Sequence, residues 1–418
     1  MKITISVPGR FHLFNLAQQL LKRDYLAQLI TSYPKFEAKK YGIPPEKVSS
    51  ILIKEIMFRG WRKLPRFLQN IYNPQYLICE IFDKLAARNL GKADIVIGGS
   101  SMFLHTLRKA KSSGAIAVVE RGSSHILYQN NILKEEYEKF GVKMRTFLLP
   151  HPEVIEKELK EYEEADYISI PSSYVKRTFL ENGVPENKLI QVPYGVDLSA
   201  FRQIPKTDKV FRVVFAGGMT LRKGVHYLLR AFSELKLPNS ELILIGSLND
   251  EIKPFFKKYG VRYRGSTSQT LTSIREEVEP RKIEKNTRTP KNSKITYIGH
   301  IPQKELFKYY SQSSVFVIMS IEEGLALVQP QAMACGLPVI YTVNTGGEDI
   351  VRDGTDGFVI PIRDVEALKE KILYLYNNPE ICRKMGESAK ERVSNGFTWD
   401  DYGNKIISAY QKVLDKKT

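Results

Sequence analysis

A glutamate and the short helix that follows it carry the chemistry of residues 319–340. The stretch reads MSIEEGLALVQPQAMACGLPVI, with Glu323 in a loop and a helix predicted from the proline of QPQAMA to Gly336. Unpaired amides near Val328 and Gln329 and the helix dipole favour an anion in front of this helix. A carboxylate also accepts hydrogen bonds from hydroxyl groups. The segment predicts a site for an anionic, hydroxyl-rich ligand, and an ordinary turn with a solvated glutamate is the alternative.

A pair of cations lies about 100 residues before that glutamate. AGGMTLRKGVHYLLRAF, residues 216–232, is predicted as a strand end, a turn and a helix, with Arg222 and Lys223 at the helix start. Cations oppose the positive end of the helix dipole, so a bound anion would explain them. An ordinary surface pair is the alternative, and the position ahead of Glu323 favours the anion.

The elements that must position these residues alternate between strand and helix in both halves of the chain. This order predicts an α/β fold with two doubly wound units, each a parallel sheet covered by helices. In the first half, apolar runs of strand length lie at 2–7, 26–30, 94–97, 115–120, 167–170 and 189–192, and helices at 13–22 and 152–164. In the second half, strands are predicted at 212–216, 241–245, 295–298, 315–319 and 339–342.

The length of 418 residues exceeds what one hydrophobic core normally organises, so at least two domains are expected. A polar, proline-containing stretch after VPYGVD indicates the boundary. Residues 260–294 lack periodicity and carry nine Lys or Arg and four Glu, which predicts an exposed insertion. The predicted divisions are a first domain at 1–197, a linker at 198–208, a second domain at 209–396 and an amphipathic final helix at 397–418.

Residues 323–340 closely resemble the signature of glycosyltransferase family 4, in which a Glu, seven residues and a second Glu precede an AMA-x-G-x-P-V-I run. Glu323 is the first glutamate, and Gln331 stands at the second position, a departure from the pattern. The resemblance implies a GT-B fold, in which two Rossmann-like domains face each other across a cleft. It also implies that the first domain binds the acceptor, that the second binds a nucleotide sugar, and that the last helix crosses back to the first domain.

The resemblance implies a role for each matching residue of the second domain. At Gln331, the side-chain amide oxygen can still accept a hydrogen bond from the ribose. A second departure is Gly218, which stands where the family usually has Arg. The stretches 297–310 and 344–361 are similar to the family's base-binding segment and to its Gly-rich turn with a following β-hairpin. The implied contacts are Glu323, Gly324, Leu325 and Ala326 for the donor sugar, Arg222, Lys223, Gly218 and Val328 for the diphosphate, Gln331 for the ribose, and His300 and Ile301 for the nucleobase.

Two loops of the first domain are candidates for the acceptor side. His125 follows an apolar strand in ERGSSHILYQ, at the end of a strand where open parallel sheets bind ligands. Family members with a His in this loop point it at the reacting sugar, which makes His125 a catalytic candidate beside Glu323. A structural histidine is the alternative. In VPGRFH, Gly9 permits close backbone approach, and Arg10 or His12 is expected to face the acceptor.

The implied reaction is retaining transfer of a hexosyl group from a UDP-, GDP- or ADP-sugar to an acceptor hydroxyl. No Asp-x-Asp motif is present to hold a metal, and neither a metal nor a cofactor is expected. In the family's mechanism the leaving phosphate takes the acceptor proton. The acceptor is expected to be lipid-linked, a glycan or a small molecule. The alternatives are a non-catalytic sugar-nucleotide-binding protein of the same fold and a basic protein that binds membranes or polyanions.

Positive charge is concentrated in the first half of the chain. Residues 1–150 contain 24 Lys or Arg against 11 Asp or Glu, whereas residues 151–418 contain 39 against 35. KEIMFRGWRKLPR, residues 54–66, mixes cations with Phe58 and Trp61 and could lie on an anionic membrane; a solvated helix face is the alternative. Nucleic acid is not expected, because no binding motif accompanies the charge. Without a spanning segment or a disulfide pattern among three cysteines, the expectation is a cytoplasmic protein at the inner face of a membrane.

Overall fold

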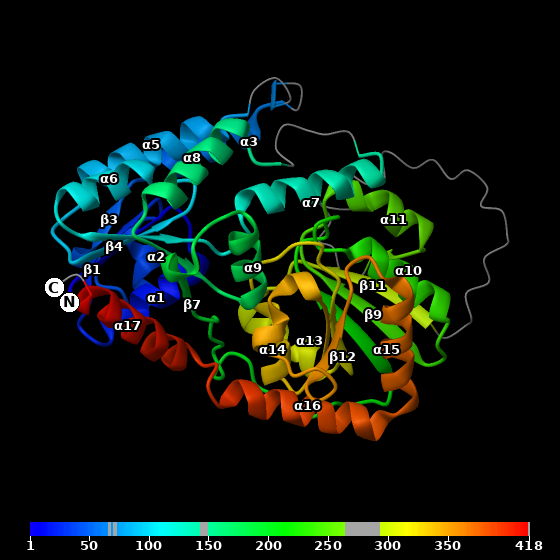
Figure 1. Ribbon diagram of the computed structural model, residues 1–418. Coiled ribbons are helices and arrows are strands. Elements are labelled where there is room, and N and C mark those ends of the chain that lie inside the picture. Colours follow the sequence, from blue (N-terminus) through cyan, green and yellow to red (C-terminus); the bar gives the residue numbers. More distant parts are fainter. Residues whose placement is uncertain (66–67, 70–72, 143–148, 264–292, 417–418) are drawn as a thin grey trace. The chain divides into compact units, whose positions relative to one another are not determined.

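The computed structural model describes residues 1–65, 68–69, 73–142, 149–263 and 293–416. The chain forms two compact units, one made of 1–195 and 399–418 and the other of 196–398 (Figure 1). The first unit is therefore built from two segments that are distant in the sequence. Most of the predicted insertion at 260–294 lies outside the described residues.

Strands and helices alternate through the first unit, as the apolar runs predicted. Its strands are β1 (Ile3–Val7), β2 (Leu26–Thr31), β3 (Val48–Ser50), β4 (Ile95–Gly99), β5 (Ile116–Glu120), β6 (Tyr167–Ile170) and β7 (Leu189–Gln191). Its helices are α1 (Phe11–Leu21), α2 (Lys35–Lys39), α3 (Ile53–Lys63), α5 (Gln75–Arg88), α6 (Leu104–Ser112), α7 (Ile126–Lys139), α8 (Pro152–Glu164), α9 (Ser173–Glu181) and α17 (Trp399–Asp415), with 3-10 turns η1 (Pro45–Lys47) and η2 (Glu186–Lys188).

The first sheet has seven strands in the order β3-β2-β1-β4-β5-β6-β7, and their pairings are parallel. The chain leaves β1 toward β2 on one side and returns to β4 on the other. Loops that follow β1 and β4 therefore diverge at the carboxyl edge of the sheet, which is where open parallel sheets bind ligands. Strand β3, with the sequence VSS, was not predicted.

The second unit repeats this architecture. Its strands are β8 (Phe211–Ala216), β9 (Ser240–Ile245), β10 (Arg262–Tyr263), β11 (Ser293–Gly299), β12 (Val315–Ile318), β13 (Val339–Thr342) and β14 (Gly357–Ile360). Its helices are α10 (Val225–Leu235), α11 (Lys253–Lys258), α13 (Leu306–Ser311), α14 (Val328–Ala334), α15 (Val365–Asn377) and α16 (Pro379–Ser394), with 3-10 turns η3 (Asp250–Ile252), η4 (Gln303–Glu305), η5 (Val343–Thr345) and η6 (Gly347–Asp349). Helices α10 and α15 lie side by side (Figure 1).

The second sheet is also parallel, with the order β10-β11-β9-β8-β12-β13-β14. Its diverging loops follow β8 and β12. The predicted β-hairpin within 344–361 was wrong, because β14 pairs with β13 in parallel as a single edge strand. The α/β prediction with two doubly wound units is confirmed.

Two segments outside the sheets are packed against their own unit. They are the predicted linker at 198–208 and the final helix. Phe201 is 2% exposed and its ring stacks on Tyr310 at 6.4 Å, so the predicted linker at 198–208 is packed on the second unit. Helix α17, red in Figure 1, lies beside α1 in the first unit. It buries Tyr402, Ile406 and Tyr410, because these residues recur at helical spacing on one face.

Candidate active site

Glycines open the carboxyl edge of the second sheet. Gly217 and Gly246 follow β8 and β9 with φ angles of +152° and +138°, which side chains rarely permit. A Cβ on Gly246 would lie 1.8 Å from the carbonyl oxygen of Gly217, so the two strand ends approach as closely as their backbones allow. Gly218, the predicted diphosphate position, comes next and is partly exposed. Backbone atoms rather than side chains therefore form the surface at this edge of the second sheet.

The turn that carries the two predicted cations packs directly on the loop after β12. Gly224 has φ +65°, and a Cβ there would lie 1.8 Å from the carbonyl oxygen of Met319. The Ile321 amide donates to the Arg222 carbonyl at 2.8 Å. Arg222 and Lys223 are thereby held against the segment that contains Glu323.

Each of these cations has a carboxylate partner within the chain. The Arg222 guanidinium lies 2.9 Å from Glu322 Oε2 and also donates to the Glu322 carbonyl at 3.1 Å. The Lys223 ammonium contacts the Glu323 carboxylate. Glu322, which was not predicted as a site residue, balances the charge of Arg222 within the chain, and the bound anion that was predicted to explain the pair stays a prediction.

The four side chains differ in how far they are exposed. The Glu322 side chain is 0% exposed, whereas those of Glu323, Lys223 and Arg222 are 17%, 23% and 31% exposed. Burial and the charge of Arg222 lower the pKa of Lys223 to about 7, against the attraction of Glu322. The cluster thus offers an incoming anion two accessible cations, and one of them changes charge near neutral pH.

The Glu323 loop is fixed from the other side by the turn after β13. The Glu323 amide donates to the Asn344 carbonyl at 2.9 Å, and Asn344 Nδ2 donates to the Ile321 carbonyl at 2.9 Å. Thr342 Oγ1 donates to the Ser320 carbonyl at 2.6 Å. The NTGGED segment therefore holds the loop in place, because its polar groups satisfy the loop's backbone.

Helix α14 begins at Val328 and ends at Ala334, followed by Gly336 with φ +80°. The predicted free amide of Gln329 was wrong, because it donates to the Ala326 carbonyl at 2.9 Å. Leu325 and Ala326 are buried behind Glu323.

The ribose and nucleobase candidates lie at the same edge of the second sheet. Gln331, on α14, is 6% exposed. His300 is exposed and Ile301 half-buried just after β11. The Gly246 amide donates to the Gly299 carbonyl at 2.9 Å, which brings the end of β11 beside the glycines of β8 and β9.

The acceptor candidates of the first unit surround the turn after β1. The exposed Phe11 ring lies against Gly9, 2.3 Å from where a Cβ would stand, so a side chain there would require this ring to move. Arg10 lies 3.3 Å from Glu37 and over the Tyr33 ring at 5.2 Å. These contacts turn Arg10 toward Tyr33 and helix α2.

His12 pairs with a glutamate that the sequence analysis missed. Its Nε2 lies 2.7 Å from Glu120 Oε1, across 108 residues of sequence, and its ring stacks on Tyr194 at 4.1 Å. Glu120 is the last residue of β5 and follows a fully apolar run. The only sequence signal was a carboxylate at the end of a buried strand.

His125 is buried among aromatic rings of the first unit. It is 2% exposed and packs 5.1 Å from Tyr162 and 5.0 Å from Phe179, ring centroid to ring centroid. Its Nδ1 accepts a hydrogen bond from the Leu127 amide at the start of α7. Burial and then Arg121 lower the pKa of His125 to about 4, so it is neutral at physiological pH. The structure therefore gives His125 a packing and helix-capping role, and its catalytic role stays a prediction.

Elsewhere in the first unit, three side chains of types that can bind a metal ion lie close together. Atoms of Glu80, Asp83 and His105 lie within 4.8 Å of one another. The Lys157 ammonium lies 2.5 Å from Glu80 and 2.8 Å from Asp83 and supplies the positive charge that these carboxylates need. The cluster is therefore a buried ion-pair network.

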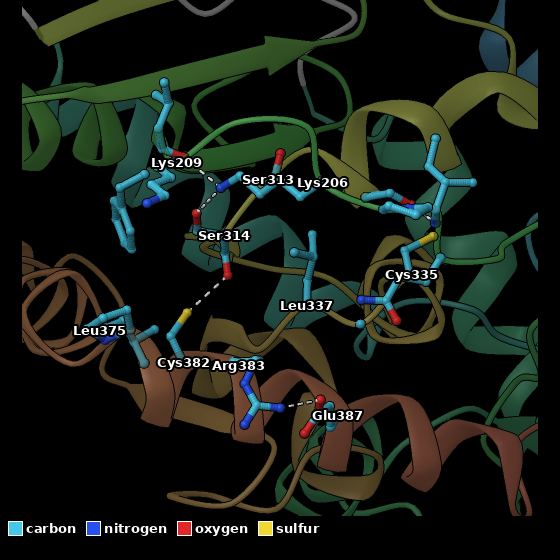
Figure 2. A pocket seen from close by; sticks show the side chains of 18 of the residues that line it. Lys206, Lys209, Ser313, Ser314, Cys335, Leu337, Leu375, Cys382, Arg383 and Glu387 are labelled. Atoms are coloured by element: carbon cyan, nitrogen blue, oxygen red, sulfur yellow. Dashed lines mark hydrogen bonds and ion pairs between the residues drawn. The ribbon is translucent and has the colours of Figure 1, made fainter.

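A cavity of about 880 Å³ lies at the opposite, amino-terminal edge of the second sheet (Figure 2). Lys206, Leu337, Cys382 and Arg383 are among its lining residues, and Cys382 Sγ lies 3.2 Å from the Ser314 carbonyl oxygen. Because ligands of open α/β sheets bind at the carboxyl ends of strands, this cavity is separate from the candidate site.

Helix α3 presents the basic segment of the first unit to solvent. None of its residues is buried, and Ile53, Ile56 and Phe58 are 45%, 68% and 38% exposed. Lys54 and Arg62 lie over the Phe58 ring at 5.6 Å and 5.8 Å. Among the described residues, no helix has both the length and the apolar character needed to cross a bilayer.

Known proteins resemble both the sequence and the fold. Residues 198–392 match the family described as glycosyl transferases group 1. An uncharacterized glycosyltransferase of Methanocaldococcus jannaschii is 27% identical over 252 residues, which cover 60% of this chain and 61% of the relative. The capsular polysaccharide biosynthesis glycosyltransferase CapM of Staphylococcus aureus is 26% identical over 264 residues, covering 60% and 62%. The chain thus spans about three fifths of the length of these relatives.

The fold is GT-B. The structure of HepE from Anabaena in complex with UDP has a TM-score of 0.65 at 14% identity, covering 99% of this chain and 100% of that one. Together with the two parallel sheets, this similarity confirms two Rossmann-like units of GT-B type.

Proposed function

We propose that this protein is a retaining, metal-independent glycosyltransferase that moves a hexosyl group from a nucleoside diphosphate sugar to an acceptor hydroxyl. The observation that carries the proposal is the doubled ion pair of Arg222 with Glu322 and of Lys223 with Glu323 at the diverging loops of the second sheet. Cations and a carboxylate meet there, as a diphosphate and a sugar hydroxyl require. The match of residues 198–392 to glycosyl transferases group 1 supports the same assignment.

Each group has a role in the proposed reaction. Arg222 and Lys223 neutralise the diphosphate as it leaves, which is preorganised electrostatic stabilisation. Glu323, released from Lys223, binds donor-sugar hydroxyls and stabilises positive charge at the anomeric carbon. Gln331 accepts a ribose hydrogen bond, and the backbone after β11, at His300 and Ile301, receives the base. Retention follows from the family 4 resemblance.

The class of donor and acceptor also belongs to the proposal. HepE was solved with UDP, so a UDP-sugar is the first donor to test. CapM is described as acting in capsular polysaccharide biosynthesis, which supports an acceptor in glycan or polysaccharide synthesis. The exposed basic helix α3 supports an encounter with an anionic membrane surface, where a lipid-linked acceptor would be found.

The experiment that tests the function measures donor binding and turnover together. The pure protein is titrated with UDP-, GDP- and ADP-glucose by calorimetry, and slow hydrolysis of each donor is followed by chromatography with and without EDTA. We expect one nucleotide to bind and to be hydrolysed equally in both conditions. Binding without hydrolysis would indicate a non-catalytic binder, and loss of activity in EDTA would refute metal independence.

A further inference from the structure

The cavity of about 880 Å³ at the amino-terminal edge of the second sheet has no part in the reaction proposed above. Its lining residues lie between positions 203 and 390, so it is built within the second unit alone. Most of its wall comes from the segment before β8, the loop after α13, the turn after α14 and helix α16. Its volume falls in the range of roughly 300–1,000 Å³ that is typical of small-molecule sites.

Part of the cavity wall is apolar and aromatic. Leu337 is buried, and the rings of Phe211 and Tyr376 meet edge to face with their centroids 5.3 Å apart. Helix α16 packs directly on the backbone of the turn after α14, because a Cβ on Gly386 would lie 2.1 Å from the Gly336 carbonyl oxygen. This close packing fixes the shape of the wall, and its aromatic rings suit a flat apolar group.

The cavity also has more positive than negative side chains. Arg383 lies 2.6 Å from Glu387, so these two lining residues balance each other. Among the residues that the structure describes, the other charged side chains of the lining, Lys206, Lys209 and Lys390, form no ion pair. Three ammonium groups therefore surround the cavity without a carboxylate partner, and a bound anion would balance them.

The two cysteines of the lining do not supply the missing negative charge. Burial raises the pKa of Cys335 to about 12 and that of Cys382 to about 11, although Lys390 and Lys206 act in the opposite direction. Both thiols are therefore neutral at physiological pH. Cys382 Sγ also donates to the Ser314 carbonyl at 3.2 Å, as a neutral thiol can.

Lys206 and Ser314 form a pair of hydrogen-bond donors at the cavity (Figure 2). The Lys206 ammonium donates to the Val210 carbonyl at 2.6 Å and to Ser314 Oγ at 2.8 Å, and an ammonium has a third N–H to offer. Ser314 Oγ accepts from Lys206 and from the Arg212 amide at 3.1 Å, which leaves its own hydrogen free to donate. The pair is thus held in place with two donors available to an anion.

We propose that this cavity binds a small phosphorylated molecule with a flat apolar part, at a site separate from that of the nucleotide sugar. Lys206 and Ser314 bind the phosphate, since charge-assisted hydrogen bonds from lysine are a common means of holding one. Lys209 and Lys390 strengthen the positive potential around it. The apolar part of the ligand lies against the aromatic wall. The inference goes beyond the proposed sugar transfer and does not depend on it.

The test titrates the full chain with 1-naphthyl phosphate by calorimetry. We expect saturable binding that weakens as salt rises, and weaker binding of inorganic phosphate and of 1-naphthol, each of which offers only one part of the ligand. Lys206→Gln should lower the affinity about 10- to 100-fold, as the loss of a charge-assisted hydrogen bond typically does. Lys206→Arg keeps the charge and should retain most of the affinity. The thermal midpoint shows that each variant is folded.

Two further lysine variants serve as controls. Lys384→Gln removes a lysine of α16 that does not line the cavity, and Lys223→Gln removes one from the proposed diphosphate site; both should bind 1-naphthyl phosphate like wild type. If Lys223→Gln weakens binding and folded Lys206→Gln does not, the ligand occupies the donor site and the proposal is overturned. It is also overturned if wild-type protein does not bind 1-naphthyl phosphate. A separate titration with UDP-glucose tests the proposed function, so the two failures are distinguished.

Discussion

Arg222 and Glu322 form an ion pair at 2.9 Å, and the residues that follow them, Lys223 and Glu323, form a second pair beside it. The two pairs join the loop after β8 to the loop after β12. Because one partner of the first pair is fully buried and both partners of the second are partly exposed, we expect the first to hold the loops and the second to exchange its partner for the donor.

Replacing Glu323 by Gln should preserve folding and lower donor turnover roughly 100-fold, because the variant loses charge where positive character develops on the sugar. Turnover is measured by donor hydrolysis and folding by the thermal midpoint. Glu366→Gln, on an exposed face of α15, is the matched control. Near-wild-type turnover in Glu323→Gln would rule out the assigned role.

Arg222→Met should lower the free energy of unfolding by about 1–3 kcal/mol, since the buried Glu322 loses its guanidinium. A double-mutant cycle with Glu322→Gln isolates the pair, and chemical denaturation measures it. We expect the double variant to be more stable than the sum of the single losses implies. Strict additivity would show that the two side chains are not coupled.

Donor affinity should fall as pH rises above about 7. The folded protein holds Lys223 at a lowered pKa of about 7, so the ammonium that attracts a diphosphate is fully present below that pH and is lost above it. Calorimetry between pH 6 and 9 tests this dependence. Lys223→Arg keeps its charge throughout and should flatten the profile; an unchanged slope would exclude Lys223 as its source.

Gln331→Ala should weaken donor binding by roughly 1–3 kcal/mol, the cost of leaving buried ribose hydroxyls unpaired. The comparison is between a nucleoside diphosphate sugar and the corresponding 2′,3′-dideoxy nucleotide, each titrated by calorimetry. The variant should lose affinity only for the ribose form. Equal affinity of wild type and variant for both nucleotides would refute a ribose contact.

Wild-type protein should bind anionic vesicles in a salt-sensitive manner, because each Lys or Arg near such a surface contributes about 1 kcal/mol. Replacing Arg59, Arg62 and Lys63 of α3 by Gln should abolish sedimentation with phosphatidylserine vesicles without changing donor hydrolysis. Replacing Lys253, Lys257 and Lys258 of α11 removes equal charge and should leave binding intact. If both triple variants lost vesicle binding equally, the net charge of the protein rather than helix α3 would explain the binding.

Several elements could be predicted because their sequences favour one structure locally. Strand β6 and helix α8 occupy the predicted residues 167–170 and 152–164, since a buried parallel strand reads as an apolar run and the helix starts with proline. Strand β3 was missed because VSS is only three residues long and has a single apolar residue, Val48. Its place depends on pairing with β2.

The sequence predicted which residue types form the candidate site, but it did not predict most of the contacts between them. The motif around Glu323 and the cation pair were found, but the partners Glu322 and Glu120 were not, because they join residues 100 or more positions apart. The burial of His125 was not predicted, since a strand end gives no information on whether the next loop turns its side chain outward or into the core. Only packing against Tyr162 and Phe179 decides that.

The placement of α17 has a consequence for the order in which the protein can fold during synthesis. The second unit, 196–398, has been translated completely before α17 is made, whereas the first unit still lacks the helix that packs beside α1. Domains generally fold as they emerge, in order from the amino terminus. Here the part that is translated first is completed last, so its apolar surface at α1 stays uncovered for the time needed to translate about 200 residues.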